Sequence, residues 1–361
     1  MGVHRRIGIL TSGGDCAGLN AVIRAVVHHA GRTYGWEVLG ICRATQGLME
    51  RPPAVVKLDI DKVDRLLTAG GTMLGTTNKG NPFAFPMYDG SLRDRSEEIV
   101  EAYHLLKLDA LIGIGGDGSL AILRKLAEQG NFNLVGIPKT IDNDVDLTEQ
   151  SIGFDTAVNI ATEALDRLQF TAASHSRVMV LEVMGRDAGH IALAAGIAGG
   201  ADVILIPEIP YSIEKVCRDI KERQARGKNF SLVVISEAVC TENGEQVTNT
   251  DMAGQCRLGG IGQYLAEQIS NRIGAEARVT VLGHLQRGGK PSPLDRLLGT
   301  AFGVSAVDLV AEGKYDRMMA WRDRQVTHVP IADAIARYRT VDPQNDTLVK
   351  TARAIGICFG D

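Results

Sequence analysis

The chain has 361 residues, of which 45% are hydrophobic and 23% charged, and its formal net charge is −4. This is the composition of a globular protein long enough for roughly two domains, and the absence of a basic stripe argues against a nucleic-acid partner. No apolar run reaches membrane-spanning length and no signal-peptide pattern is present. The six cysteines form no Cys-x-x-Cys pair. We therefore expect a cytoplasmic protein with no membrane partner and no disulfide or zinc scaffold.

Strand-like and helix-like segments alternate along the chain. A strand is expected at 7–10, a helix with an apolar face at 20–31 and a second strand at 37–41. After a long loop at 76–91, further strands are expected at 110–114, 134–137, 177–183, 202–207, 230–236 and 278–282, with a helix at about 119–129. This rhythm predicts an α/β fold in which helices cover both faces of parallel sheets.

Three glycine-rich turns are expected to follow strands. The first spans 11–15 and contains Gly14, the second spans 115–119 and contains Gly116 and Gly118, and the third spans 70–75. Glycine lets the backbone approach a phosphate closely, and a helix that begins after such a turn offers unpaired N–H groups. The first two turns match neither the P-loop nor the dinucleotide-binding pattern, so they predict phosphate binding of another kind.

An acidic loop follows the strand at 134–137. Its sequence is Pro-Lys-Thr-Ile-Asp-Asn-Asp at 138–144, with Asp142 and Asp144 beside Lys139 and Thr140. In open α/β sheets the chemistry lies just beyond the carboxyl ends of strands. One carboxylate could accept a proton from a substrate hydroxyl while the other helps to hold a metal, and the alternative is an acidic surface turn.

Asp117 lies in the second glycine turn, where the next helix is expected to begin. Mg²⁺ is commonly held by one or two carboxylates together with phosphate oxygens, so Asp117 suits a magnesium site. The alternative is that Asp117 caps the helix, and the two roles are compatible.

Cationic side chains gather at strand termini in the second half of the chain. A single arginine there is usually a solvated surface charge, but a set of them beside glycines suits phosphate recognition. Glu237 ends another strand and could bind sugar hydroxyls; the alternative is an acidic residue at the start of a helix. The set comprises Arg177, Arg186, Arg278, His284 and Arg287. Together with the first half, these residues outline phosphoryl transfer between a phosphate donor and a phosphate-bearing acceptor.

Several long motifs resemble those of the 6-phosphofructokinase family and occur in the family's order from Ile7 to about Leu309. They are LTSGGDCAGLNAVIR at 10–24, GGTMLG at 70–75, GIGGDGS at 113–119, PKTIDND at 138–144, GFDTA at 153–157, EVMGRDAGHIALAAGIAGGAD at 182–202 and VLGHLQRGG at 281–289. The resemblance implies two similar three-layer α/β/α lobes with mainly parallel sheets and an active site in the cleft between them. It implies a donor-binding lobe at 1–153 plus about 286–335 and a fructose 6-phosphate lobe at 154–285 plus about 336–361.

The resemblance also implies a Mg²⁺-dependent kinase that phosphorylates the 1-hydroxyl of fructose 6-phosphate. Asp142 would be the general base, Thr140 and Arg186 would steady the phosphoryl group, and Asp117 and Asp144 would serve Mg²⁺. The donor would be bound by Gly14, Asn78, Lys79, Gly116, Asp117, Gly118, Ser119 and Lys139. The sugar phosphate would be bound by Thr140, Asp142, Asp144, Arg177, Met184, Gly185, Arg186, Glu237, Arg278, His284 and Arg287.

The identity of the donor is open at this level. Family members that use ATP usually have glycine at the positions of Gly118 and Lys139, and pyrophosphate users usually have aspartate and lysine there. An aspartate at position 118 would put bulk and charge where a nucleotide's α-phosphate must pass, so Gly118 favours ATP over pyrophosphate. Asn78 departs from the arginine common in bacterial ATP users, and the adjacent Lys79 could substitute for it as a point charge.

The resemblance further implies a homo-oligomer, with a tetramer favoured and a dimer possible, in which Arg177 and Arg278 cross a subunit interface. Two alternatives remain open. Another kinase that shares the Gly-Gly-Asp-Gly turn would lack the acidic loop, and a non-catalytic sugar-phosphate sensor would be expected to have lost Asp142 or Arg186. Both residues are present.

Overall fold

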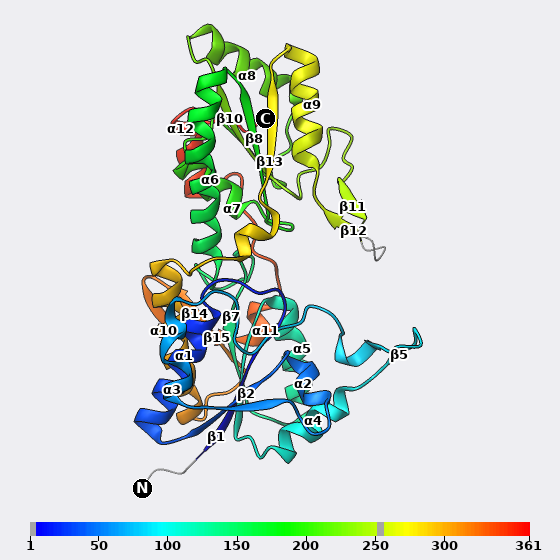
Figure 1. The fold of residues 1–361 in the computed structure, drawn as a ribbon, viewed down its shortest axis with the longest axis vertical. Coiled ribbons are helices and arrows are strands. Elements are labelled where there is room, and N and C mark those ends of the chain that lie inside the picture. The colour runs from blue at the N-terminus through cyan, green and yellow to red at the C-terminus, as the bar shows by residue number, and fades with distance from the viewer. Residues whose placement is uncertain (1–4, 251–255) are drawn as a thin grey trace. The chain divides into compact units, whose positions relative to one another are not determined.

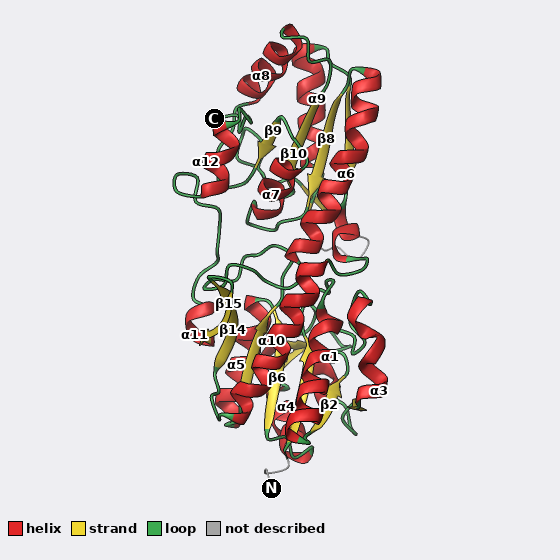
Figure 2. Cartoon of the chain, turned by 90° about the vertical axis from the view of Figure 1, so that its left-hand side faces the viewer, coloured by secondary structure: helices red, strands yellow, loops and turns green. Residues whose placement is uncertain are grey.

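The computed structural model describes residues 5–250 and 256–361. The chain forms two compact units, which are described separately. Unit 1 holds residues 1–156 and 287–338, and unit 2 holds residues 157–286 and 339–361. In each unit, helices cover both faces of a sheet (Figures 1 and 2). No helix in the described ranges combines the length and the apolar character needed to span a membrane.

The sheet of unit 1 has seven strands in the order β15-β14-β7-β6-β1-β2-β3. All neighbours from β14 to β2 pair in parallel, whereas the edge strands β3 and β15 pair antiparallel. The strands are β1 (Arg6–Thr11), β2 (Glu37–Ile41), β3 (Val55–Leu58), β6 (Ala110–Gly115), β7 (Leu134–Pro138), β14 (Arg317–Arg322) and β15 (Gln325–Pro330). The central strands β1, β6 and β7 are apolar and almost wholly buried, as expected for parallel strands covered on both faces.

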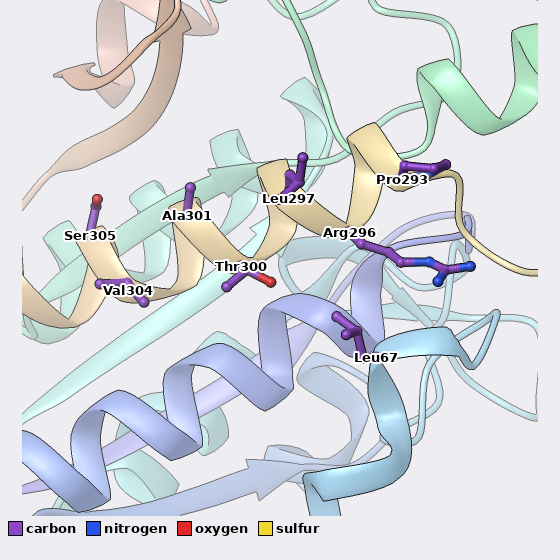
Figure 3. Close-up of a pocket in the computed structure, with 8 residues that line it drawn as sticks. All are labelled: Leu67, Pro293, Arg296, Leu297, Thr300, Ala301, Val304 and Ser305. Atoms are coloured by element: carbon purple, nitrogen blue, oxygen red, sulfur yellow. The ribbon is translucent and has the colours of Figure 1, made fainter.

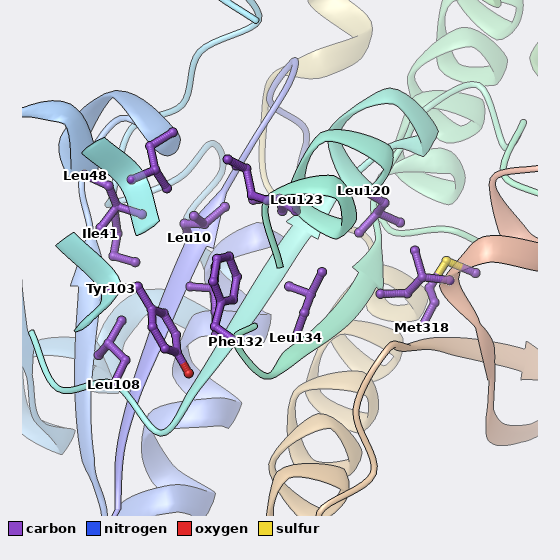
Figure 4. Close-up of a cluster of buried hydrophobic side chains, with 14 of the residues drawn as sticks. Leu10, Ile41, Leu48, Tyr103, Leu108, Leu120, Leu123, Phe132, Leu134 and Met318 are labelled. Carbon is purple, nitrogen blue, oxygen red and sulfur yellow. The ribbon is translucent and has the colours of Figure 1, made fainter. Parts of the chain in front are cut away.

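Helices α1 and α10 pack against each other on one face of this sheet, and α5 packs on the other. The helices of unit 1 are α1 (Leu19–His29), α2 (Thr45–Met49), α3 (Ile60–Val63), α4 (Ser96–Leu105), α5 (Asp117–Gly130), α10 (Pro293–Ala311) and α11 (Ile331–Ala334). A π-helix η1 (Ala30–Tyr34) continues α1, and the 3-10 helices are η2 (Asp64–Thr68) and η3 (Pro82–Ala84). Figure 4 shows Leu10 and Leu134 of the sheet beside Leu120 and Leu123 of α5 in one buried cluster. Burial of each such leucine side chain stabilises the folded state by about 1.5–3 kcal/mol relative to leaving it exposed.

The sheet of unit 2 has four parallel strands in the order β13-β8-β10-β9. They are β8 (Val178–Val183), β9 (Val203–Leu205), β10 (Ser231–Ser236) and β13 (Ala277–Val281). The helices are α6 (Phe154–His175, which begins in unit 1), α7 (His190–Ala198), α8 (Ile213–Ala225), α9 (Ile261–Ile273) and α12 (Thr347–Ala354), with a 3-10 helix η4 (Gly283–Arg287). The C-terminal segment of the chain pairs with β9, since Val203 and Cys358 form a parallel bridge, and so it covers an otherwise open sheet edge.

The structure corrects several expectations. The third glycine turn follows η2 rather than a strand. Helix α5 begins two residues earlier than expected, so its N-cap is Gly116 and Asp117 is its first residue, which removes the N-cap role for Asp117. The 76–91 loop contains η3 and the strand β4 (Phe85–Pro86), which pairs with β5 (Leu92–Arg93), and a further antiparallel pair is β11 (Thr248–Thr250) with β12 (Cys256–Leu258). The sheet of unit 1 is mainly parallel, as expected, with antiparallel edge strands β3 and β15; β15 follows β14 after a two-residue turn, which can join only antiparallel neighbours.

A hollow lies along α10 beside η2, lined by Leu67, Leu297 and Ala301 among others (Figure 3). None of its lining residues belongs to the predicted site.

Candidate active site

The carboxyl ends of β1, β6 and β7 meet at one edge of the sheet in unit 1, because these strands are neighbours and run in parallel. The first glycine turn follows β1, the second follows β6 and the acidic loop follows β7. Backbone hydrogen bonds hold them together: the Ser12 N–H donates to the Ile114 carbonyl at 2.8 Å and the Lys139 N–H to the Gly115 carbonyl at 2.9 Å. Three segments that are distant in sequence are thus brought to one place.

The third turn reaches the same edge although it follows a 3-10 helix. The Thr11 hydroxyl donates to the Gly75 carbonyl at 2.9 Å, and Asn20 of α1 donates to the Gly70 carbonyl at 3.0 Å. The loop that follows is tied to the first turn, since the Gly13 N–H donates to the Thr77 carbonyl at 2.9 Å. Asn78 and Lys79, the next two residues, are exposed.

The second turn presents the N-terminus of the 14-residue helix α5. A Cβ placed on Gly118 would meet no atom within 4 Å, so open space faces this residue. The hydroxyl of Ser119 lies 3.0 Å from the position that a Cβ on Gly13 would take, so the first two turns are in contact. A helix N-terminus that faces open space can accept an anion through its unpaired N–H groups and its dipole.

The acidic loop is buried and braced. Asp142 and Asp144 are each 3% exposed. Asn143 between them has φ 53°, a left-handed conformation that asparagine tolerates. Its side-chain oxygen accepts the Ser151 N–H at 3.0 Å and its amide donates to the Glu149 carbonyl at 3.0 Å. This brace holds the two carboxylates in place.

Thr140 is part of the same loop. Its hydroxyl accepts the Asp142 N–H at 3.1 Å, and its carbonyl accepts the Ser151 hydroxyl at 2.9 Å. The described residues contain no group of three or more His, Cys, Asp or Glu side chains that could hold a metal by themselves. Two carboxylates that share Mg²⁺ with donor phosphates, such as Asp117 and Asp144, would need no such group.

Lys139 and Arg287 hold the first glycine turn through hydrogen bonds from their side chains to its carbonyl groups. Lys139 is 4% exposed, and its ammonium donates to the Gly14 carbonyl at 2.5 Å. Arg287 belongs to unit 1 and donates to the Asp15 carbonyl at 3.2 Å. Burial lowers the pKa of Lys139, and the nearby Arg287 lowers it further.

A second set of predicted residues gathers in unit 2 at the carboxyl ends of β13, β8 and β10. Met184–Arg186 follow β8, Glu237 follows β10 and His284 lies in η4 after β13. One Glu237 carboxylate oxygen lies 3.4 Å from the N–H groups of both Gly185 and Arg186, which donate to it. Since parallel strands end at the same sheet edge, these residues form one surface within the unit.

Arg177 and Arg278 lie at the opposite edge of that sheet. Arg177 directly precedes β8 and Arg278 is the second residue of β13. Both are paired with Glu276, at 2.9 Å and 2.6 Å, and these interactions lower the pKa of its carboxyl. The length of β8 separates them from His284 by about 20 Å. Within unit 2 the structure therefore separates the predicted ligands of the sugar's 6-phosphate: Arg177 and Arg278 lie at one edge of the sheet, and His284 follows the other. Arg287 is the last residue of η4, the 3-10 helix that contains His284.

The comparison with known families returns the description Phosphofructokinase, matched over residues 6–310. The chain belongs to the phosphofructokinase family. Among its relatives, ATP-dependent 6-phosphofructokinase 1 of Synechocystis sp. is 71% identical over 361 residues, and the protein of the same name from Nostoc sp. is 72% identical over 361 residues; each alignment covers 100% of both chains.

Among solved structures, the pyrophosphate-dependent phosphofructokinase of Nitrosospira multiformis matches with a TM-score of 0.82 at 22% identity, over 99% of this chain and 93% of that one. At this identity the likeness shows the phosphofructokinase fold alone. The two-lobe α/β fold expected from the motifs is thus confirmed.

Four residues that the sequence did not single out position the phosphofructokinase motifs. Asn143 and Ser151 brace the acidic loop, and the Thr76 hydroxyl donates to the Gly13 carbonyl at 2.7 Å. Gln286 is 1% exposed and accepts the Met184 N–H at 2.8 Å. The available signal was proximity to a motif: Asn143 lies inside PKTIDND and Gln286 inside VLGHLQRGG.

Proposed function

We propose that the protein transfers the terminal phosphoryl group of ATP to the 1-hydroxyl of fructose 6-phosphate, forming fructose 1,6-bisphosphate in glycolysis. The observation that carries the proposal is the identity of 71% and 72%, over the full length of both chains, to relatives named ATP-dependent 6-phosphofructokinase 1. The two glycine turns and the helix N-terminus at one edge of unit 1 support a phosphate donor there.

ATP is the proposed donor, and pyrophosphate is not favoured. The open space at Gly118 leaves room beside the helix N-terminus for a nucleotide's α-phosphate. The proposed donor site also includes Asn78, Lys79 and Ser119. Asn78 and Lys79 are exposed, so a ligand can reach them. In this proposal Lys79 provides a point charge toward the donor phosphates.

Asp142 is the proposed general base. Its carboxylate accepts the proton of the 1-hydroxyl while that oxygen bonds to the terminal phosphorus and the bond from phosphorus to the ADP oxygen breaks. Thr140 and Arg186 would stabilise the phosphoryl group in transit. The bracing of the loop by Asn143 supports this role, because a base must be held within hydrogen-bond reach of its proton.

Mg²⁺ is the proposed cofactor, held by Asp117 and Asp144 together with the donor phosphates. It would neutralise charge on the phosphates when bound. The location of Asp117 at the start of α5 and of Asp144 on the acidic loop supports this assignment, since both follow strands that end at the same sheet edge.

The sugar phosphate would contact Met184, Gly185, Glu237 and His284 of unit 2. Arg177 and Arg278 lie at the other edge of the sheet, so we propose that they serve the site of a neighbouring subunit. The protein would then act in the cytoplasm as a homo-oligomer, with a tetramer favoured over a dimer, in which the partner copy completes each site.

The first experiment compares initial rates of fructose 6-phosphate phosphorylation with Mg²⁺ and either ATP or pyrophosphate, for the wild type and Asp142→Asn. We expect a higher kcat/KM with ATP and a loss of about 10²–10⁴-fold in the variant, the usual contribution of a general base. A higher kcat/KM with pyrophosphate would reverse the donor assignment, and tight fructose 6-phosphate binding without turnover would indicate a sensor.

A second experiment tests whether Arg177 acts in a neighbouring subunit. Asp142→Asn and Arg177→Ala chains are each expected to be nearly inactive. When equal amounts are denatured and refolded together, activity should return to about a quarter of the wild-type value for a pairwise interface, because one of the two sites in each mixed dimer is then intact. Activity that stays at the level of the separate variants would place Arg177 in its own subunit's site.

A further inference from the structure

Three consecutive carbonyl groups of the first glycine turn are each held by a side chain from another segment. The Thr76 hydroxyl donates to the Gly13 carbonyl at 2.7 Å, and the Lys139 ammonium donates to the Gly14 carbonyl at 2.5 Å. Arg287 donates to the Asp15 carbonyl at 3.2 Å. The donors come from the 76–79 loop, the acidic loop and the end of η4, which are far apart in the sequence.

The direction of these carbonyls decides the direction of the neighbouring N–H groups. In a planar trans peptide the carbonyl of one residue and the N–H of the next point in opposite directions. Holding the carbonyls of residues 13–15 therefore turns the N–H groups of Gly14, Asp15 and Cys16 away from the three donors. Within the described ranges, none of these three N–H groups donates a hydrogen bond to a protein backbone acceptor. Cys16 is wholly buried, whereas Gly14 and Asp15 are partly exposed, so the N–H groups of Gly14 and Asp15 are the two that can face a ligand. Successive free N–H groups of this kind form an anion-binding concavity.

Lys139 also connects this turn to the second glycine turn. Its own N–H donates to the Gly115 carbonyl at 2.9 Å, and its carbonyl oxygen lies 3.4 Å from the position of a Cβ on Gly116. Its ammonium lies 3.2 Å from the position of a Cβ on Gly13. One residue thus contacts the first turn through its side chain and the second through its backbone, and the space beside Gly13 is already filled by its ammonium.

We propose that Thr76 and Lys139 are positioning residues of the donor site, which aim the N–H groups of Gly14 and Asp15 at the donor phosphates and themselves touch no donor atom. The inference rests on the proposed function, in which this turn binds the donor. It assigns a role to Thr76 and changes the role of Lys139 from donor ligand to tether. Because the Lys139 ammonium acts on the backbone, it strengthens the binding of every phosphate donor equally and does not select pyrophosphate.

The test is a double-mutant cycle on donor affinity, measured by titration calorimetry of MgATP and of magnesium pyrophosphate into the full-length protein without sugar phosphate. The variants are Lys139→Met, Thr76→Val and the double variant, with Lys314→Met as the control, since Lys314 of unit 1 is exposed and its ammonium pairs with Glu312 on the surface. Loss of a hydrogen bond from a charged donor should raise the Kd for ATP by about 10-fold or more in Lys139→Met, and loss of a neutral one by about 5-fold in Thr76→Val. The control should bind as the wild type does.

If both residues act through the same turn, their effects do not multiply, and the double variant is little worse than Lys139→Met alone. In each single variant the Kd for pyrophosphate should rise by the same factor as the Kd for ATP. The KM for fructose 6-phosphate should stay within about 2-fold of the wild-type value in these variants. Thr76→Ser, which keeps the hydroxyl, should bind as the wild type does; this comparison remains decisive if Lys139→Met does not fold.

Four results would overturn the inference. The first two are effects on Kd that multiply in the double variant, and a loss of affinity confined to pyrophosphate. The other two are an unchanged Kd in both single variants, and a Thr76→Ser variant that binds as weakly as Thr76→Val. A wild type that binds MgATP but transfers nothing to fructose 6-phosphate would remove the proposed function and leave this test in force. A wild type that binds neither donor would remove both.

Discussion

The Gln286 side-chain oxygen accepts the Met184 N–H at 2.8 Å, and its amide donates to the Ala157 carbonyl at 3.4 Å. Gln286 is 1% exposed. Residues 157 and 286 are the positions at which the chain enters and leaves the first part of unit 2. A single buried amide therefore joins the turn after β8 to both crossing segments.

Gln286→Leu should leave the Met184 N–H unpaired in a buried place, at a cost of about 1–3 kcal/mol, whereas the Ala157 carbonyl keeps its intrahelical partner in α6. We expect the KM for fructose 6-phosphate to rise by about 10-fold while the KM for ATP changes little, because the displaced turn carries Met184 and Gly185. Gln286→Glu keeps the acceptor for the Met184 N–H, so its KM for fructose 6-phosphate should lie between those of the wild type and Gln286→Leu. Steady-state kinetics for both substrates check this, and equal changes in both KM values would contradict it.

Gly118→Asp should weaken ATP binding without unfolding the protein. Open space faces Gly118, so the larger side chain fits, but its carboxylate would stand at the N-terminus of α5 beside the donor phosphates. We expect the KM for ATP to rise by about 10-fold or more through charge repulsion at close range. Gly118→Ala is the matched control and should retain near wild-type kinetics. An aspartate variant with unchanged KM for ATP would place the nucleotide elsewhere.

Asp295 links the start of α10 to the start of α6 and is 1% exposed. Its carboxylate accepts the Gly153 N–H at 2.8 Å and both the N–H (2.9 Å) and the hydroxyl (2.5 Å) of Thr156. Asp295→Asn turns a double acceptor into one that presents an NH₂ group to these donors. The expected loss in free energy of unfolding is about 2–4 kcal/mol.

Urea unfolding measures this loss. Asp308→Asn, on the same helix but 40% exposed, should lose less than about 1 kcal/mol. Equal losses in the two variants would contradict the role of Asp295 as a buried link between α10 and α6.

His190 should make unit 2 less stable in acid. It is 8% exposed, its Nε2 donates to the Arg339 carbonyl at 3.2 Å, and burial, with a contribution from Arg339, lowers its pKa from 6.5 to about 4. Between these two pH values the unfolded chain binds a proton that the folded chain does not, so stability falls as the pH drops from about 6.5 to 4 and the loss is complete below 4. The full shift corresponds to about 3 kcal/mol.

Thermal unfolding at pH 4.5 and pH 7 measures this dependence. His190→Gln should lose part of it, whereas His104→Gln, which alters an exposed histidine, should behave as the wild type does. An identical pH dependence in all three proteins would exclude His190 as a source.

The local elements could be read from the sequence because their causes are local. The apolar runs at 110–114 and 134–137 are short and contain isoleucine or valine, a pattern that favours buried strands, and the structure has strands at both places. Family membership could also be predicted, since the motifs at 10–24, 113–119 and 138–144 are long and ordered. The start of α5 was missed by two residues because Asp117 and Gly118 are weak helix formers, and the helix N-terminus is stabilised by its place in the fold.

Other features depend on pairing between distant segments, and only the tertiary structure decided them. The order of β7, β6 and β1 brings the turns together, and the direction of β8 and β13 puts Arg177 and Arg278 at the edge opposite His284. The Lys139 ammonium points into the protein because the Gly14 carbonyl lies within its reach there. The sequence by itself determined which segments are strands, helices and phosphate-binding turns, since these follow from local periodicity and backbone freedom. It could not decide which side chains meet, because that depends on strand order and register, which are set by burial across the whole unit.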